Sequence, residues 1–418
     1  MLRTIGLEWQ HSRLYRLYIL LLLAGFLKQC IDYATLVDAA EYLQAAHHLM
    51  QGNWSSCGDL LPCGTHWLEA TRRTPGYPVL LLLVGFMPLL MLAVQGLLAA
   101  FIPLWSIQLL ARIETAPRSR KLLMIAFIFY PLQFFYSNFL MPEIWVQALV
   151  LLGVLHLASK NYGNIPLILS ALVLLKPVFI IFLPISLVLL LRTQQRRWFQ
   201  LMPVAVVLMV SGVNFRNTGW FHFTAMAVEN TYEYNMRAVM NRVNTPNEIE
   251  ALYKNYSTIL KPLRDAERAQ FMRRVSSEKI SKHLPVYFML HVLGSVATLL
   301  DPGRYDLVAF WGIKDVGGFM NIKTAERQLP PWPQLFYMGV LLLWRLVLLW
   351  LAMRWWLQRN NWFLRMLIVI PLLLLPFSAG PVGSARYLFP VAPLLFVMAA
   401  AGLNTFRNKQ NHEADLVA

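Results

Sequence analysis

Residues 77–111 read YPVLLLLVGFMPLLMLAVQGLLAAFIPLWSIQLLA and contain no charged side chain. A helix that crosses a bilayer needs about 20 mostly apolar residues, so this stretch is long enough for one or two passes. The polar pair Gln95-Gly96 marks the point where we expect it to break into two. Within lipid, backbone amides and carbonyls are satisfied only in helices or closed barrels. The stretch therefore predicts membrane helix.

Comparable apolar runs recur along the whole chain. Beside 77–111 they cover 17–27, 121–140, 144–159, 164–176, 178–191, 199–215, 284–300, 334–357, 362–377 and 386–403. These runs are too many to be buried in one water-facing core, and they predict about ten to twelve spanning helices. We therefore expect residues 1–418 to form a single transmembrane domain of the all-α polytopic class.

The composition agrees with a lipid solvent. Of the 418 residues, 57% are hydrophobic and 14% are charged, against about 25% charged in soluble domains. The formal charge of +16 is high enough to suggest nucleic-acid binding. However, no nucleic-acid-binding module or aromatic-basic platform is present, and Lys and Arg gather in short clusters between apolar runs, as they do in cytoplasmic loops of membrane proteins. Nucleic acid is therefore not expected as a partner.

The basic clusters also predict which side each loop faces. They lie at 112–121, 192–198 and 354–365 and in the tail at 404–418, which we expect to be cytoplasmic. The loops 32–76 and 216–283 then face the opposite side. The first apolar run follows Arg3, Arg13 and Arg16 and no small-residue cleavage site succeeds it, so it reads as a retained span with its N-terminus inside.

One conflict remains in this topology. Two passes through 77–111 would place the basic cluster 112–121 on the outer side, against the positive-inside rule. Either the stretch crosses once, together with an interfacial or re-entrant piece, or the charge count misleads at this point.

Each of the two outer loops is long enough to carry chemistry. In the first, 38–50 has the pattern of a helix. In the second, Thr245-Pro246-Asn247-Glu248 is a helix start with an N-cap Thr, Pro at the first helical position and Glu at the third. The helical pattern beyond it, through Arg264 to Lys282, is expected to be amphipathic and to lie on the bundle or on the membrane surface. Residues 301–333, rich in Gly, Pro and aromatic residues, read as interfacial.

The three cysteines have different surroundings. Cys30 ends the first apolar run and is expected to be a packing residue, whereas Cys57 and Cys63 lie close together in the first outer loop. An extracytoplasmic loop favours a disulfide between them. A zinc site that adds His66 is the alternative, although the spacing matches no standard ligand pattern.

Acidic residues beside a membrane are candidates for chemistry because burying them is costly. Asp38 and Glu41 are three residues apart, which places both carboxylates on one face of a helix. Such a pair can act as a general base or hold a divalent cation, and a solvated helix start is the structural alternative. Glu143 is a third acid, at the end of an expected membrane span.

Cationic side chains also gather at the ends of the expected spans. Arg72 and Arg73 precede the turn Pro75-Gly76-Tyr77, Lys176 stands between two apolar runs, and Arg386-Tyr387 opens the last span. Guanidinium groups in such positions can clamp a phosphate, or they can anchor the chain at the interface.

The order of these motifs resembles the GT-C superfamily of membrane glycosyltransferases. It is most similar to the branch that holds bacterial aminoarabinose transferases and protein O-mannosyltransferases. The matching elements span nearly the whole chain: Asp38-Ala39-Ala40-Glu41-Tyr42, Arg73 to Pro78, Glu143, Leu175-Lys176-Pro177, Asn214-Phe215-Arg216-Asn217 and Arg386-Tyr387.

The resemblance implies a GT-C-like helix bundle in a bacterial inner membrane, with the site facing the periplasm. The enzyme would move a sugar from a polyprenyl-phosphate carrier to an acceptor, which the sequence leaves unidentified. Asp38 would be the catalytic base and Glu143 a second acid. Arg72, Arg73, Lys176, Arg386 and Tyr387 would bind the carrier phosphate, with Glu41, Tyr77 and Arg216 in supporting roles.

The sequence departs from this family in two respects. It has no large soluble domain after Leu403, and Glu41 lies a helical turn from Asp38, whereas many relatives carry two adjacent acids. Metal dependence stays open, because branches of the superfamily differ and no cluster with metal-ligand spacing is readable.

A transporter or flippase of lipid-linked glycans is the alternative function. It predicts internal symmetry and charges near the centres of the spans. The candidate charges lie at span ends, which favours an enzyme.

Overall fold

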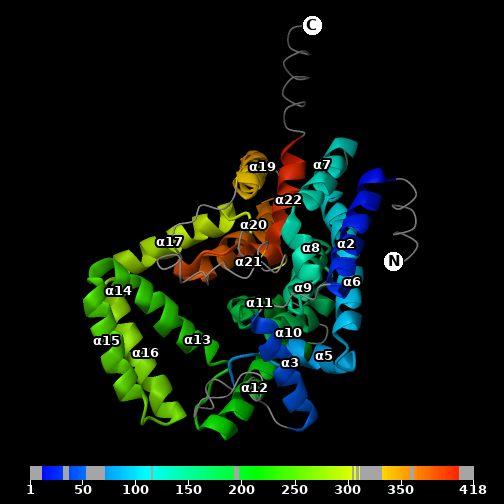
Figure 1. Ribbon diagram of the computed structural model, residues 1–418. Coiled ribbons are helices and arrows are strands. Elements are labelled where there is room, and N and C mark those ends of the chain that lie inside the picture. Colours follow the sequence, from blue (N-terminus) through cyan, green and yellow to red (C-terminus); the bar gives the residue numbers. More distant parts are fainter. Residues whose placement is uncertain are drawn as a thin grey trace.

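The computed structural model describes residues 12–31, 37–52, 71–113, 116–192, 197–303, 306, 310, 332–357 and 362–403. Within these residues every regular element is helical (Figure 1). The chain is thus an all-α protein, as predicted.

Several of the helices have the length and composition of membrane spans. Among the described residues five qualify: α2 (Arg13–Ile31), α6 (Pro88–Leu110), α12 (Met202–Thr218) with the turn before it, the Phe336–Trp356 part of α19 (Trp332–Trp356) and the segment Ala385–Gly402. Four shorter apolar helices accompany them: α9 (Glu143–Ala158), α10 (Ile165–Leu175), the Pro177–Leu191 segment and α20 (Trp362–Ser378). This pattern is that of a polytopic membrane protein, although the full-length spans are fewer than the sequence led us to expect.

The 77–111 stretch contains one helix that is long enough to cross. It divides into α5 (Gly76–Leu83) and α6, and the chain turns between them at Gly85 and Phe86, which both have positive φ. A helix of 8 residues rises about 12 Å, well short of a bilayer core of about 30 Å. The expected break at Gln95-Gly96 is therefore wrong, and a single crossing removes the conflict with the basic cluster 112–121.

Gln95 sits inside α6 because its side chain has partners there. The hydroxyl of Tyr77 donates to its Oε1 at 2.6 Å, and its Nε2 donates to the carbonyl oxygen of Phe139 at 2.8 Å. Phe139 lies between α8 (Pro131–Ser137) and α9, where backbone carbonyls lack helical partners. A polar residue in an apolar run thus marks a buried contact, with no break in the helix.

Tyrosine hydroxyls fasten α2 to α6. Tyr15 and Tyr18 are fully buried and donate to the carbonyl oxygens of Ala100 and Ala99 at 3.0 and 2.9 Å. Most of the other side chains of α2 are apolar and face away from the protein, as expected for a helix that contacts lipid. Cys30 belongs to that surface: it is exposed, so the expected packing role is wrong.

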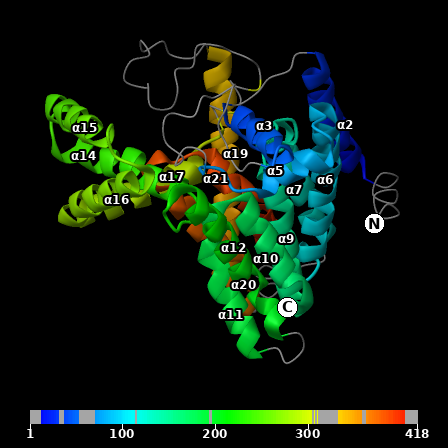
Figure 2. The same ribbon diagram turned by 90° about the horizontal axis from the view of Figure 1, so that it is seen from below.

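The remaining apolar helices form one body around a single large core. Figure 2 shows α9, α10, α12, α20 and α11 (Leu183–Arg192) running alongside one another. The last helix, α22 (Ala392–Gly402), is almost completely buried and packs against α19, α6 and α7 (Pro117–Ile128).

A separate lobe projects from this body in both views (Figures 1 and 2). It consists of α14 (Arg237–Val243), α15 (Pro246–Leu260) and α16 (Asp265–Lys282), and it has its own apolar core. The expected helix start is confirmed, because Thr245 and Glu248 form a reciprocal capping box. The helical pattern expected beyond this start, to Lys282, forms two helices, α15 and α16, and α17 (Leu284–Leu300) leaves α16 at an angle of 95°.

Some sequence predictions lie outside the described residues. These are the Cys57–Cys63 disulfide and its zinc alternative with His66, the tail 404–418, and most of the interfacial stretch 301–333. They stay predictions.

Candidate functional site

Charged residues from six parts of the chain meet at one end of the helix bundle. Asp38 and Glu41 lie on α3 (Val37–Met50), Glu143 begins α9, and Arg386 lies on the short helix α21 (Ala385–Leu388). We call the group the ion cluster: Asp38, Glu41, Arg72, Arg73, Glu143, Lys176, Glu229 and Arg386. Seven of its eight members were predicted from the sequence.

Asp38 lies between two guanidinium groups. Arg73 donates to its Oδ1 at 2.6 Å and Arg386 donates to its Oδ2 at 2.5 Å. The side chains of Asp38 and Arg386 keep 24% and 27% of their surface exposed, whereas that of Arg73 keeps 9%. Asp38 and Arg386 are thus partly accessible, whereas Arg73, which also binds Asp38, is nearly buried.

Glu143 is a buried acid that joins Lys176 and Arg386 within the ion cluster. Its side chain has no exposed surface, and its Oε1 accepts from Arg386 at 2.5 Å and from Lys176 at 2.9 Å. Its Oε2 is buried without a hydrogen-bond partner among the described residues. Lys176, which the sequence presents as an isolated cation, is held by this carboxylate between α10 and the 3-10 helix η2 (Pro177–Phe182).

A third carboxylate links Arg72 to Arg73. Glu41 accepts from Arg73 Nε at 2.5 Å and from Arg72 at 3.3 Å. The expected pairing of Asp38 and Glu41 on one helix face is therefore confirmed, because both contact Arg73. Arg72 also donates to Glu229 at 2.8 Å. Glu229 ends α13 (Met226–Glu229), where the chain enters a π-helical segment, η4 (Asn230–Met236), a rare element that is frequent at functional sites.

The ion cluster is balanced in charge. It holds four carboxylates and four cations, each within ion-pair distance of an opposite charge. Burial alone would raise the pKa of the Asp38 carboxyl, but the charges of Arg386 and Arg73 outweigh it and hold that pKa well below the usual range. Asp38 is thus ionised at neutral pH, and in this state it is a weak base.

The backbone that carries Arg72 and Arg73 is anchored by the segment after α12. Thr224 donates to the carbonyl oxygen of Arg72 at 2.7 Å, and the Thr71 hydroxyl contacts His222 Nε2 at 2.7 Å. Burial lowers the pKa of His222, and a neutral ring fits the contacts, because Nδ1 can donate to the Trp220 carbonyl oxygen while Nε2 accepts. Asn214 holds this segment through the carbonyl oxygens of His222 and Phe223.

Arg386 is placed by a different residue, Asp301. The Asp301 carboxylate accepts from the backbone amides of Gly303 and Ala385, at 2.9 and 2.8 Å. The Ser384 side chain accepts from the Arg386 amide. Together they cap α21 and orient the first turn that bears the Arg386 side chain.

Close backbone packing brings Arg73 and Lys176 to the same site. A Cβ atom added to Gly76 would lie 2.6 Å from the carbonyl oxygen of Leu174 and 2.9 Å from the amide nitrogen of Leu175. Only glycine allows this approach between the turn after Arg73 and the end of α10.

We expect Gly76→Ala to lower the free energy of unfolding by about 1–3 kcal/mol, because the added carbon overpacks a backbone contact. The same variant should weaken any function that needs Arg73 and Lys176 together. Gly96→Ala is the matched control, since nothing lies within 4 Å of the added carbon there. Denaturation of both purified variants in detergent checks this, and equal stability would contradict it.

Three predicted residues stand apart from the ion pairs. Tyr77 is fully buried, packs edge-on against Tyr42 and bonds Gln95, so it is a core residue. Arg216 lies exposed in the last turn of α12 and makes no ion pair with a described residue. Tyr387 is half-buried beside Arg386 on α21, and its hydroxyl forms no hydrogen bond within the described part of the chain.

Sequence reasoning missed the supporting residues Glu229, Asp301 and His222. Only Asp301 carries a local signal, since it precedes a Pro-Gly turn; the other two lie in a loop with many polar residues. Within the residues that the structure describes, no three His, Cys, Asp or Glu side chains lie close enough to hold a metal ion.

The ion cluster can therefore bind an anion through Arg72 and Arg386 and can offer an ionised carboxylate next to it.

Comparison of the chain with protein-family models, with curated proteins and with solved structures finds no match in any of the three.

Proposed function

We propose that the chain is a membrane glycosyltransferase that moves a sugar from a polyprenyl-phosphate carrier to an acceptor hydroxyl, with Asp38 as the base. The resemblance to the GT-C superfamily suggests this activity. The observation that carries the proposal is the position of Asp38, an accessible carboxylate held between two guanidinium groups from distant parts of the chain. The ion cluster lies at one end of the apolar helix bundle, and by the proposal a lipid-borne substrate reaches Asp38 from the membrane there.

The charge balance of the ion cluster supports an exchange of partners on binding. A carrier phosphate can be bound only if it takes over cations that now hold carboxylates, and Arg386 and Arg72 are the more exposed of the four. Once Arg386 turns to the phosphate, Asp38 loses the larger of its two stabilising charges. The pKa of Asp38 then rises toward its usual value, and its strength as a base increases.

The transfer step follows from this arrangement. The acceptor oxygen forms a bond to the anomeric carbon while the bond from that carbon to the carrier phosphate breaks. The phosphate oxygen keeps the electron pair, and its growing charge is stabilised by the released guanidinium groups. The proton of the acceptor hydroxyl goes to Asp38. Attack opposite the leaving group inverts the configuration of the anomeric carbon.

A substitution at Lys176 tests whether the ion cluster binds the carrier phosphate. By the proposal the carrier phosphate also draws on Lys176, which now binds Glu143. We expect Lys176→Met to raise the apparent KM for the lipid donor about tenfold, because that charge-assisted contact to the phosphate is lost. Lys254→Met, which removes an exposed lysine from the projecting lobe, is the control. A Lys176 variant that loses only thermal stability, with KM unchanged, would assign Lys176 to holding Glu143 alone.

The activity itself can be tested with purified protein. A total membrane-lipid extract supplies the carrier-linked sugars and acceptors, and mass spectrometry follows the release of unglycosylated polyprenyl phosphate. The proposal predicts release that depends on the protein. If the protein instead moves intact lipid-linked sugar across a vesicle membrane without releasing polyprenyl phosphate, it is a flippase and the proposal is wrong.

A further inference from the structure

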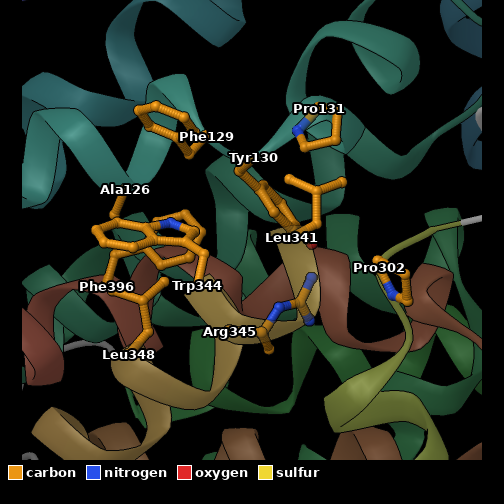
Figure 3. Close-up of a pocket in the computed structure, with 10 residues that line it drawn as sticks. All are labelled: Ala126, Phe129, Tyr130, Pro131, Pro302, Leu341, Trp344, Arg345, Leu348 and Phe396. Carbon is orange, nitrogen blue, oxygen red and sulfur yellow. The ribbon is translucent and has the colours of Figure 1, made fainter. Parts of the chain in front are cut away.

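A second polar site lies away from the ion cluster, between α7, α19 and α22 (Figure 3). This hollow has walls of aromatic and aliphatic side chains and contains one cation, Arg345. No member of the ion cluster lines it. Its lining is Ala126, Phe129, Tyr130, Pro131, Pro302, Leu341, Trp344, Arg345, Leu348 and Phe396.

Arg345 is a buried cation that forms no ion pair with a described residue, and Asp301 is the acid whose charge acts on it. Only 4% of its surface is exposed. Its guanidinium donates to the carbonyl oxygen of Leu299 at 3.2 Å and lies over the Tyr130 ring, 5.3 Å from the ring centroid. Within the described part of the chain it makes no salt bridge. Because a buried charge that lacks an ion pair is costly, its retention points to an anionic ligand.

Two further polar groups at the hollow lack partners. The Tyr130 hydroxyl and the Trp344 indole N–H are buried and form no hydrogen bond with a described residue. An indole nitrogen can only donate, so it needs an acceptor. Figure 3 shows Tyr130, Trp344 and Arg345 lining the same hollow. Three donors, one of them charged, match the oxygens of a phosphate group.

The rest of the hollow is apolar, and it lies beside exposed side chains. Phe129, whose ring packs against Trp344, keeps 50% of its surface exposed, and Leu343 on the same helix as Arg345 keeps 65%. On a membrane-spanning helix such surface faces lipid chains. A ligand held here by its phosphate would therefore lay a hydrocarbon chain along α19.

We propose that this hollow binds the phosphate headgroup of an anionic membrane lipid through Arg345, Tyr130 and Trp344. The inference stands on the unpaired donors and the apolar walls, and it holds whether or not the ion cluster transfers sugar. The bound lipid would brace the contact between α7 and α19, and it would lie beside Asp301, which orients Arg386.

The test measures lipid binding by native mass spectrometry of the purified, delipidated full chain. Phosphatidylglycerol is the lipid probe and inorganic phosphate is the soluble probe. We expect Arg345→Gln to weaken phosphatidylglycerol binding about tenfold and Tyr130→Phe about threefold, as one charged and one neutral hydrogen bond are lost. Arg112→Gln removes an exposed cation elsewhere and should change nothing.

Tyr130→Phe keeps the ring and loses one oxygen, so it gives a result even if Arg345→Gln does not fold. Unchanged phosphatidylglycerol binding in the Tyr130 variant, and in the Arg345 variant where it folds, would overturn the proposal. Inorganic phosphate bound as tightly as the lipid would also overturn it, because the site would then take a soluble anion. These outcomes are independent of any transfer assay.

Discussion

Asp38→Asn is expected to lower the rate of sugar transfer by at least about 100-fold, since a positioned base contributes that much or more. The amide can still accept a hydrogen bond from a guanidinium, but it cannot take the proton of the acceptor hydroxyl. Arg73 keeps Glu41 and Arg386 keeps Glu143 as partners, so the fold should persist. The measurement is the release of polyprenyl phosphate by purified protein, beside thermal unfolding of the same sample.

Glu278→Gln is the matched control for this change. Glu278 is an exposed acid on α16 that pairs with Lys282 and lies in the lobe away from the ion cluster. Its variant should keep full turnover. If the Asp38 variant also kept full turnover, Asp38 would have no part in the reaction, and the ion cluster would be a structural element.

Glu143→Gln is expected to have the largest effect on stability, a loss of about 3–5 kcal/mol, as found when one partner of a buried ion pair is removed. Glu143 has no exposed surface, and one of its oxygens serves both Arg386 and Lys176. The variant leaves these two cations close together with one carboxylate fewer. Denaturant unfolding in detergent measures the loss.

A double variant separates charge from shape. Glu143→Gln combined with Lys176→Met removes one charge of each sign, so it restores the balance of the ion cluster. We expect it to regain a large part of the stability that Glu143→Gln loses. If the single variant were as stable as the wild type, the pairing of Glu143 with both cations would not hold in the folded protein.

Much of the site could be predicted from the sequence, because charged residues at the ends of apolar runs are rare and costly. That reasoning found Asp38, Glu143 and Arg386 although they are separated by hundreds of residues. It could not show that Arg386 bridges the two acids. Bridging depends on how α3, α9 and α21 pack, and no local pattern encodes that packing.

The errors have a common physical origin. Gln95 looked like a break in a helix and Cys30 like a packing residue, because a sequence shows the polarity of a residue but not its partner. Gln95 is tolerated in α6 since it satisfies Tyr77 and a free carbonyl oxygen. Lys176 looked isolated for the same reason, and its partner lies on another helix. Glu229 gave no signal because acids are common in its loop.

The most direct test of the central claim is a comparison of glycoconjugates in cells that contain the protein and cells that lack it. Mass spectrometry should find one class of glycoconjugate lost without the protein and its polyprenyl-phosphate-linked sugar accumulated. Wild-type protein should restore the product, and the Asp38→Asn variant, present at equal level, should not. An unchanged set of glycoconjugates, or full rescue by the Asp38 variant, would contradict the account.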